Sequence, residues 1–209
     1  MKNAPNADFL IFDLGNVIID IYYPKTLAYI KQQVHPKLHG KVETFYLTDF
    51  HLDYEKGLIT SAQFRDEVRS YFEMDWSDQF VDELWNSLLG KIPKNRIELI
   101  KKLSDSYQVG VLSNTNEIHI NAVNLILEED HSLKSLEDIF GHVFLSHEMN
   151  LSKPDPAIYL SMVDQLGTSP ERVVFFDDLE ANVTSANKVG IQAIHVTNPQ
   201  IIFDLFAHV

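Results

Sequence analysis

The chain has 209 residues, of which 45% are apolar and 22% charged, and a net charge of −13 at pH 7. This length allows one large domain or a core with a smaller insertion, and the composition is typical of a soluble globular protein. The acidic balance argues against nucleic acid as a partner, because phosphate backbones select basic surfaces. The absence of cysteine excludes disulfides and thiolate metal sites.

Short apolar runs bounded by turn residues recur along the chain and predict strands buried on both faces. They lie at Asp8–Asp13, Gln108–Leu112, His142–Leu145, Arg172–Phe176 and Gln192–Val196. Amphipathic segments of helical length lie between these runs, at residues 95–103, 155–166 and 181–189. This alternation predicts an α/β fold with a Rossmann-like parallel-sheet core. Ligands bind at the carboxyl edge of such a sheet.

The segment from about residue 22 to 90 breaks the alternation, since it contains helical patterns and no convincing strand. The patterns cover residues 26–34, 42–50, 61–72 and 77–89. Thr60 and Gln63 resemble a capping box that opens the third helix, and Ser77 is a plausible cap for the fourth. We therefore predict a core at 8–21 plus 91–209 and an inserted helical cap at 22–90. A mobile cap is favoured over a subdomain that simply packs there, because the insertion follows the most acidic strand end.

Four polar clusters follow predicted strands or open the segments after them. They are Phe12–Val17 (FDLGNV), Leu112–Asn116 (LSNTN), Leu151–Pro156 (LSKPDP) and Phe175–Asn182 (FFDDLEAN). Adjacent carboxylates after a buried strand, such as Asp177 and Asp178, are costly without a cation. The clusters together therefore indicate a small catalytic pocket with its own local charge pattern.

These clusters match the needs of phosphoryl transfer, which are a nucleophile, positive charge and hydrogen-bond donors for the phosphoryl oxygens. Asp13 could attack phosphorus, and Mg²⁺ held by Asp13 and one of Asp177 or Asp178 could offset the repulsion between the anions. A backbone carbonyl just after Asp13 could supply another ligand. Lys153 and the Ser113 hydroxyl, helped by the Asn114 N–H, would then neutralise and orient the phosphoryl group.

In this order, the four clusters resemble the motifs of the haloacid dehalogenase-like (HAD) hydrolase superfamily, and the insertion resembles its type 1 cap. The resemblance extends from Asp8 to about Val196. Within the superfamily, the chain is most similar to a branch that contains bacterial sugar-phosphate phosphatases and the amino-terminal phosphatase domain of soluble epoxide hydrolases.

The resemblance implies a role for each matched residue, listed here in full. Asp13 would be the nucleophile and a metal ligand, Gly15 would offer its carbonyl to the metal, Ser113 and Asn114 would bind phosphoryl oxygens, and Lys153 would stabilise the nucleophile and the transition state. Asp178 would ligate the metal, Asp177 would order a metal-bound water or Lys153, and Asn182 would brace the loop. Mg²⁺ is the implied cofactor.

One position departs from most phosphatases of the superfamily, which carry a general acid–base aspartate two residues after the nucleophile. Here that position is Gly15. General acid–base catalysis contributes about 10²- to 10⁴-fold in rate, so its loss predicts a bias toward phosphates with stabilised leaving groups. Asp20 could substitute as an acid, although a structural role is the favoured interpretation.

The predicted function is therefore a Mg²⁺-dependent phosphomonoesterase acting on a small phosphorylated metabolite such as a sugar phosphate. The alternatives are a metal-free haloacid dehalogenase, in which Asp13 attacks carbon, and a phospho-ligand-binding protein with weak turnover. In the cap, Glu55, Trp85 and Asn86 are candidates to face the substrate, and the nine histidines show no zinc-binding spacing.

No stretch approaches the roughly 20 apolar residues that span a bilayer, so no membrane partner is expected. Residues 1–7 lack the apolar core of a signal peptide, which predicts a cytoplasmic location. No feature indicates a particular oligomeric state.

Overall fold

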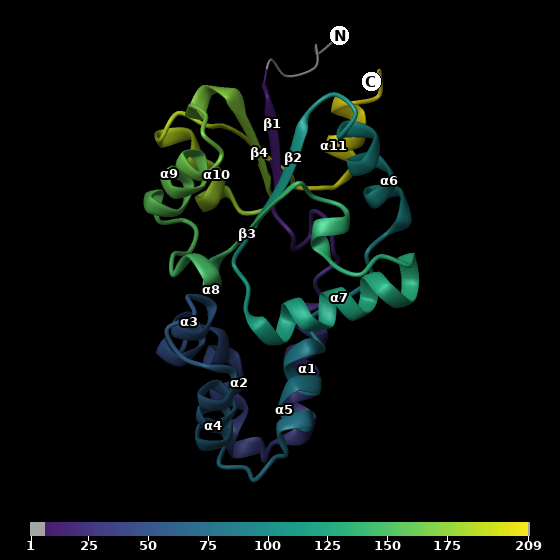
Figure 1. Cartoon of the computed structure of the whole chain (residues 1–209). Helices are drawn as coiled ribbons and strands as arrows, with labels where there is room; N and C mark the ends of the chain where they lie inside the picture. Colours follow the sequence, from purple (N-terminus) through teal and green to yellow (C-terminus); the bar gives the residue numbers. More distant parts are fainter. Residues whose placement is uncertain (1–6, 209) are drawn as a thin grey trace.

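The computed structural model describes residues 7–208, so nearly all of the amino-terminal segment 1–7 lies outside the described residues. A twisted sheet forms the upper part of the molecule, and helices α1 to α5 gather beyond the carboxyl ends of its strands (Figure 1). Among the described residues, no helix is long and apolar enough to cross a bilayer.

The sheet has five parallel strands in the order β3-β2-β1-β4-β5. Their bounds are β1 Phe9–Phe12, β2 Gln108–Ser113, β3 His142–Leu145, β4 Val173–Asp177 and β5 Gln192–His195. Each lies within one residue of its predicted bounds, and the predicted α/β class with a Rossmann-like parallel sheet is confirmed. The central position of β1 places the residue after it in the middle of the carboxyl edge.

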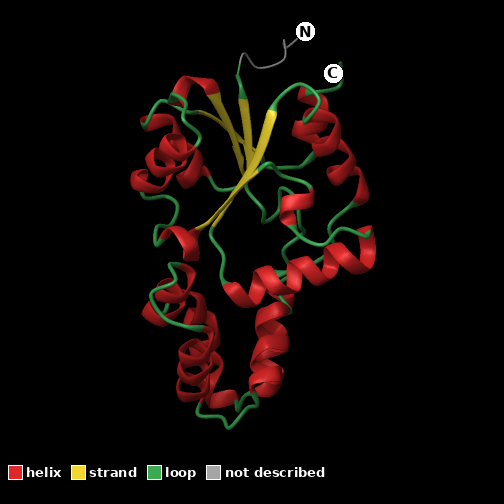
Figure 2. Cartoon of the chain, viewed as in Figure 1, coloured by secondary structure: helices red, strands yellow, loops and turns green. Residues whose placement is uncertain are grey.

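Helices cover both faces of the sheet (Figure 2), because alternate strand residues point to opposite sides. Leu10 and Phe12 pack with α6 (Lys94–Leu103), α7 (Glu117–His131) and residues around α11 (Gln200–Leu205). Ile11, on the other face, packs with α9 (Pro156–Gln165) and α10 (Glu180–Lys188). Three helices, α7, α11 and the short α8 (Ser146–Met149), have no counterpart among the predicted ranges.

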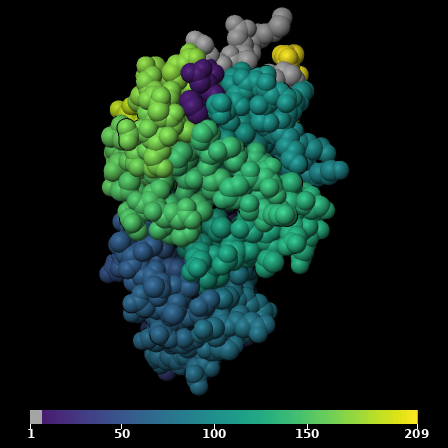
Figure 3. Space-filling model, in the orientation of Figure 1, coloured from purple at the N-terminus to yellow at the C-terminus, as the bar shows by residue number. Residues whose placement is uncertain are grey.

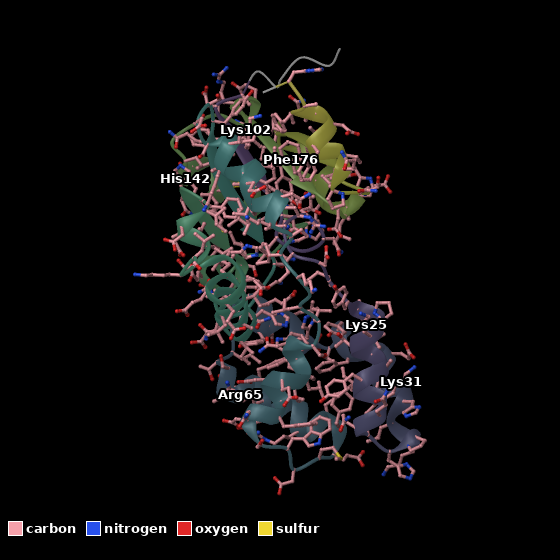
Figure 4. All side chains as sticks on the ribbon, turned by 90° about the vertical axis from the view of Figure 1, so that its right-hand side faces the viewer. Lys25, Lys31, Arg65, Lys102, His142 and Phe176 are labelled. Atoms are coloured by element: carbon pink, nitrogen blue, oxygen red, sulfur yellow. The ribbon has the colours of Figure 1, made fainter. Side chains whose placement is uncertain are left out.

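The inserted segment forms helices around an apolar cluster of its own, which the core joins through Ile118. The helices are α1 Tyr23–Gln33, α2 His39–Thr44, α3 Asp49–Glu55, α4 Ser61–Phe72 and α5 Asp78–Asn86, and Figure 4 shows Arg65 and Lys31 on opposite sides of the group. The predicted capping box is present, since Thr60 accepts from the Gln63 N–H and the Gln63 side chain accepts from the Thr60 N–H. Ser77 caps α5 by accepting from the Phe80 N–H.

The prediction of one helix over 42–50 is wrong. The chain forms α2, a 3₁₀ turn at Phe45–Leu47 and then α3. Thr48 interrupts the helix with an extended backbone (φ −73°, ψ 147°), and its hydroxyl donates to the Phe45 carbonyl at 2.8 Å. Hydroxyl side chains that bond the local backbone favour helix ends over helix interiors.

Two chain segments connect the helical insertion to the core, and they run side by side. The Gly90 N–H donates to the Asp20 carbonyl at 2.8 Å, and the Asp20 N–H donates to the Lys91 carbonyl at 2.9 Å. A Cβ on Gly90 would lie 2.6 Å from the Asp20 carbonyl oxygen, so the close pairing needs glycine there. The boundaries of the predicted cap, 22 and 90, fall beside this paired connection, and the division itself stays a prediction.

The inserted helices lie against the core on the face seen in Figure 3, below α7 and the segment that follows β3. The Ser146 hydroxyl donates to the Glu55 carbonyl at 2.5 Å, and the Asn150 side chain donates to the Lys56 carbonyl at 2.8 Å. A Cβ on Gly57 would lie 2.0 Å from the His147 carbonyl oxygen. A glycine at position 57 is therefore required for this contact.

Candidate active site

The carboxyl edge of the sheet brings three aspartates together. Asp13 directly follows β1 and donates its N–H to the Phe176 carbonyl of β4 at 2.7 Å. Asp177 ends that neighbouring strand and Asp178 follows it. One carboxylate oxygen from each of the three lies within 4.8 Å of the others. Parallel register between adjacent strands is thus what assembles the acidic cluster.

Lys153 lies at the centre of this edge and is almost fully buried. Its ammonium group donates to Asp13 Oδ1 at 2.6 Å, to Asp177 Oδ2 at 2.7 Å and to the Leu112 carbonyl at 2.9 Å. All three ammonium protons therefore have acceptors. Such complete pairing is what allows a charged side chain to be buried.

The adjacent aspartates Asp177 and Asp178 have different surroundings. Both oxygens of Asp177 accept hydrogen bonds, from Lys153, from the Asn182 side chain at 3.0 Å and from the Leu179 N–H at 2.8 Å. Asp178 is partly exposed and its side chain accepts one hydrogen bond, from Asn16 at 2.8 Å. Asp177 is therefore committed to positioning its neighbours, whereas Asp178 keeps free lone pairs.

The donor set fits a hard divalent cation. Magnesium takes oxygen ligands, and it uses one or two carboxylates while keeping several waters. Asp13 and Asp178 offer such oxygens, whereas both oxygens of Asp177 already accept hydrogen bonds from Lys153, Leu179 and Asn182. Among the residues that the structure describes, no histidine belongs to a group of three or more side chains that could hold a metal ion. The oxygen ligands of the site thus suit Mg²⁺ better than a softer metal.

Burial controls the charge state of the cluster. Burial raises the pKa of Asp13 to about 7, against the opposing pull of Lys153 and with the help of Asp177. Burial also raises the pKa of Asp178. For Lys153, burial would lower the pKa, but Asp13 and Asp177 outweigh it and raise the pKa above its usual value. Lys153 is therefore cationic at neutral pH, and a bound cation would favour the ionised aspartates.

Ser113 and Asn114 lie at the end of β2 beside the acidic cluster and line the same cavity. The Asn114 side chain donates to the Lys153 carbonyl at 2.8 Å and accepts from the Lys153 N–H at 2.8 Å. These two hydrogen bonds hold the Asn114 side chain to the Lys153 backbone, and the sequence did not predict them. The Asn114 N–H, which is the group predicted to bind phosphate, takes no part in them.

Gly15 also lines the cavity. A Cβ on Gly15 would lie 3.3 Å from Ile21 Cγ1 and 3.8 Å from Asp13 Oδ2. A side chain at this position would therefore start beside the Asp13 carboxylate. Asp20 is instead paired with Arg96 at 2.8 Å and does not line the cavity, which supports its structural interpretation.

A cavity of about 500 Å³ opens over this edge and is lined on its other side by residues of the inserted helices. Glu55 and Trp85 are among them, but Asn86 lines a different pocket with Ser61 and Glu117. The lining also includes residues that the sequence did not point to, among them Tyr46, His51 and His119. No local pattern marks them, because they come from separate helices and meet only in the folded chain.

His119 connects the two sides of this cavity through buried hydrogen bonds. Its ring stacks on Trp85 with centroids 4.8 Å apart, and its Nε2 lies 3.2 Å from the Trp85 carbonyl. The Asn116 side chain, 3.3 Å from His119 Nδ1, also accepts from the Trp85 indole N–H at 3.2 Å. Burial lowers the pKa of His119 to about 4. The ring is therefore neutral at pH 7 and couples α5 to the start of α7.

Comparisons with known proteins give a consistent family. A model of the haloacid dehalogenase-like hydrolase family matches residues 7–190. A D-ribitol-5-phosphate phosphatase of Bacteroides thetaiotaomicron is 24% identical over 190 residues, which are 90% of this chain and 91% of that protein.

The solved structures agree with this family. A HAD family enzyme of Bacteroides thetaiotaomicron in complex with magnesium has a TM-score of 0.83 and 33% identity, over 91% of this chain and 93% of that one. The same enzyme with magnesium and inorganic phosphate has a TM-score of 0.82, at 34% identity over 90% and 93% of the two chains. A predicted HAD-like hydrolase from Porphyromonas gingivalis has a TM-score of 0.80 and 26% identity, over 91% of each chain.

Proposed function

The chain belongs to the haloacid dehalogenase-like hydrolase family, and we propose that it is a Mg²⁺-dependent phosphomonoesterase acting on a small sugar-type phosphate. The observation that carries the proposal is the buried Lys153 ammonium, hydrogen-bonded to both Asp13 and Asp177 with Asp178 alongside. A lone carboxylate would repel a phosphate dianion, whereas this cluster adds a cation and ligands for a second one. The magnesium complex of one similar enzyme and the D-ribitol-5-phosphate phosphatase activity of another relative support the same proposal.

In the proposed reaction, an Asp13 carboxylate oxygen attacks phosphorus and the bond from phosphorus to the ester oxygen breaks. That oxygen leaves as an alkoxide, which takes a proton from solvent water to give the alcohol. The product on the enzyme is an aspartyl-phosphate. Water then attacks that phosphorus, which releases inorganic phosphate and restores the carboxylate. Lys153 offsets the negative charge on the nucleophile and the transferring oxygens throughout.

The remaining residues position the reacting groups. Asp13, the Gly15 carbonyl and Asp178 would hold Mg²⁺, which when bound supplies positive charge to the phosphoryl oxygens. Ser113 and the Asn114 N–H would donate to those oxygens. Asp177 orients Lys153, and Asn182 fixes Asp177. We further propose that residues 22–90 act as the cap that closes the cavity and keeps bulk water from the site.

Because Gly15 carries no carboxyl, the proposal includes a preference for stabilised leaving groups. Expulsion of a poor leaving group depends on a proton donor, which the matched position lacks. A Brønsted plot of kcat/KM against leaving-group pKa should therefore slope steeply downward. Gly15→Asp should flatten it, since the new carboxyl would start beside Asp13; a flat plot for the unaltered protein would contradict the preference.

The direct test is hydrolysis of p-nitrophenyl phosphate and a panel of sugar phosphates with Mg²⁺ and with EDTA. Activity that is lost in EDTA and restored by Mg²⁺ would support the proposal. Release of halide from a 2-haloacid in EDTA would favour the metal-free dehalogenase instead. A stable aspartyl-phosphate, or a beryllium fluoride complex without turnover, would indicate a phospho-ligand-binding protein.

A further inference from the structure

The side of the cavity opposite the aspartates includes Tyr46, His51, Glu55 and Trp85 of the inserted helices, which we call the cap wall. Tyr23, Leu88 and Leu89 of the same segment also line the cavity. Three residues of the cap wall pack as an aromatic group. Tyr46 stacks on Trp85 with centroids 5.3 Å apart, and His51 meets both rings edge-on at 5.4 Å. Such rings present apolar faces against which the C–H groups of a carbohydrate can pack.

Two polar atoms of the cap wall are buried without a hydrogen-bond partner among the described residues, the Tyr46 hydroxyl oxygen and His51 Nδ1. The other ring nitrogen of His51, Nε2, lies 3.5 Å from Glu55 Oε1. His51 Nδ1 is therefore the ring atom left for a ligand. Buried polar atoms are almost always hydrogen-bonded. Two such atoms without a partner in one wall of a cavity therefore point to hydrogen-bonding groups from outside the chain.

Hydroxyl groups are suited to both atoms, because each can act as a donor and as an acceptor. One can pair with His51 Nδ1, another with the Tyr46 hydroxyl, and neighbouring hydroxyls can donate to the Glu55 carboxylate. An apolar chain would leave the two atoms unpaired. The cap wall is therefore matched to a ligand that carries several hydroxyls.

The charges of the cavity argue against a second anionic group on that ligand. Among the described residues that line the cavity, Lys153 is the only lysine or arginine, and it already bonds two carboxylates. The cap wall adds the negative charge of Glu55. A carboxylate or second phosphate placed there would be buried beside a like charge with no arginine or lysine to pair with it.

We propose that the cap wall is a subsite for the hydroxyls of an uncharged polyol or sugar, and that it selects monophosphates without a second anionic group. This inference rests on the proposed phosphatase function. It assigns Tyr46 and His51 to hydroxyl recognition and Glu55 to both hydroxyl binding and rejection of anions.

The first test uses the unaltered protein with Mg²⁺ and four matched substrates. They are a five-carbon alditol monophosphate, the aldonate phosphate in which the far CH₂OH is a carboxylate, the bisphosphate with a phosphate at each end, and n-pentyl phosphate. We expect kcat/KM for the alditol phosphate to exceed each of the others by at least about 10-fold, as is usual for a site with buried groups that need a partner. Equal or faster hydrolysis of the aldonate phosphate or the bisphosphate would overturn the inference.

The second test changes one group at a time. Tyr46→Phe should lower the ratio of alditol phosphate to n-pentyl phosphate kcat/KM by about 3- to 10-fold, the value of one hydrogen bond. Glu55→Gln should raise the ratio of aldonate phosphate to alditol phosphate by about 10-fold, since a partly buried like charge is removed. Tyr71→Phe is the matched control, because that cap hydroxyl bonds the Lys41 carbonyl at 2.9 Å and does not line the cavity.

Unchanged ratios in Tyr46→Phe and Glu55→Gln would contradict the assigned residues. Failure of the proposed function gives a different result, because then no substrate, including p-nitrophenyl phosphate, would be hydrolysed in Mg²⁺. That outcome would refute the inference together with the function on which it rests.

Discussion

The two sides of the cavity use their polar atoms in opposite ways. On the core side, Lys153 and Asp177 are saturated with hydrogen bonds inside the protein. On the cap wall, the Tyr46 hydroxyl and His51 Nδ1 are buried with no hydrogen-bond partner among residues 7–208. Lys153 and Asp177 are therefore fixed within the protein, whereas our proposal leaves the two cap-wall atoms to pair with the ligand.

This difference follows from what each side has to do. Charge stabilisation of a transition state works best when the groups are fixed in advance, since no reorganisation is then needed during the reaction. Discrimination between substrates works best when a wrong ligand leaves buried groups unpaired. One side of the cavity thus holds the reacting groups in fixed positions. On the proposed function, the unpaired atoms of the other side distinguish substrates that can pair with them from substrates that cannot.

The largest effect expected on the core side comes from its nucleophile. Asp13→Asn keeps the size of the side chain but removes the attacking oxygen charge, so turnover should fall by at least about 10⁴-fold. Steady-state hydrolysis of p-nitrophenyl phosphate measures the loss, and circular dichroism checks that the variant is folded. Near-normal turnover in this variant would refute the covalent mechanism.

Lys153 tests whether the core side also holds the fold together. Lys153→Met would leave Asp13 and Asp177 buried without their cation, which should lower the free energy of unfolding by about 3–5 kcal/mol. Urea denaturation in EDTA measures the change. Lys94→Met, which alters an exposed lysine, is the control and should stay within about 0.5 kcal/mol of the unaltered protein.

The adjacent carboxylates Asp177 and Asp178 should respond differently to the same substitution. Asp178→Asn should raise the half-saturating Mg²⁺ concentration by at least about 10-fold with little change in stability, because it removes the negative charge of a proposed ligand. Asp177→Asn should lower stability by about 1–3 kcal/mol, because buried donors lose their acceptor. Magnesium titration of activity and thermal unfolding separate the two, and the reverse pattern would exchange the assigned roles.

The smallest expected effect concerns the coupling between the two sides. His119 has a pKa of about 4 in the folded chain against 6.5 for an unperturbed histidine, so the unfolded chain binds the proton first as pH falls. Stability from this residue is thus present above pH 6.5 and is lost on the way down to pH 4. Between pH 7 and pH 5 the loss should be about 2 kcal/mol.

Urea denaturation at the two pH values measures that loss. His119→Asn should flatten the pH dependence, and His208→Asn, at an exposed position, is the comparison. An identical pH dependence in His119→Asn and the unaltered protein would show that the buried ring is not the titrating group.

The sequence predicted the sheet closely because its strands are encoded locally. Leu10 and Phe12 are buried on one face of the sheet and Ile11 on the other, so β1 needs a continuous apolar run. Such a run is visible in the sequence without knowledge of the neighbouring strands. The capping box at Thr60 is equally local. The prediction of one helix over 42–50 failed at Thr48. A threonine fits a helical pattern but also favours a helix end, and the local sequence does not show which of the two the folded chain adopts.

By itself, the sequence determined the class of fold, the five strands and the residues at their carboxyl ends. Parallel strands must bring those ends to one edge, so Asp13 and the Asp177–Asp178 pair could be grouped before any coordinates. Lys153 reaches them from the loop between α8 and α9. The resemblance implied different roles for Asp177 and Asp178, and only the tertiary structure shows which donors reach each carboxylate. The tertiary structure also packed Tyr46 and His51 against Trp85 of α5 in one wall of the cavity, because contacts between separate helices depend on side-chain packing that no local pattern records.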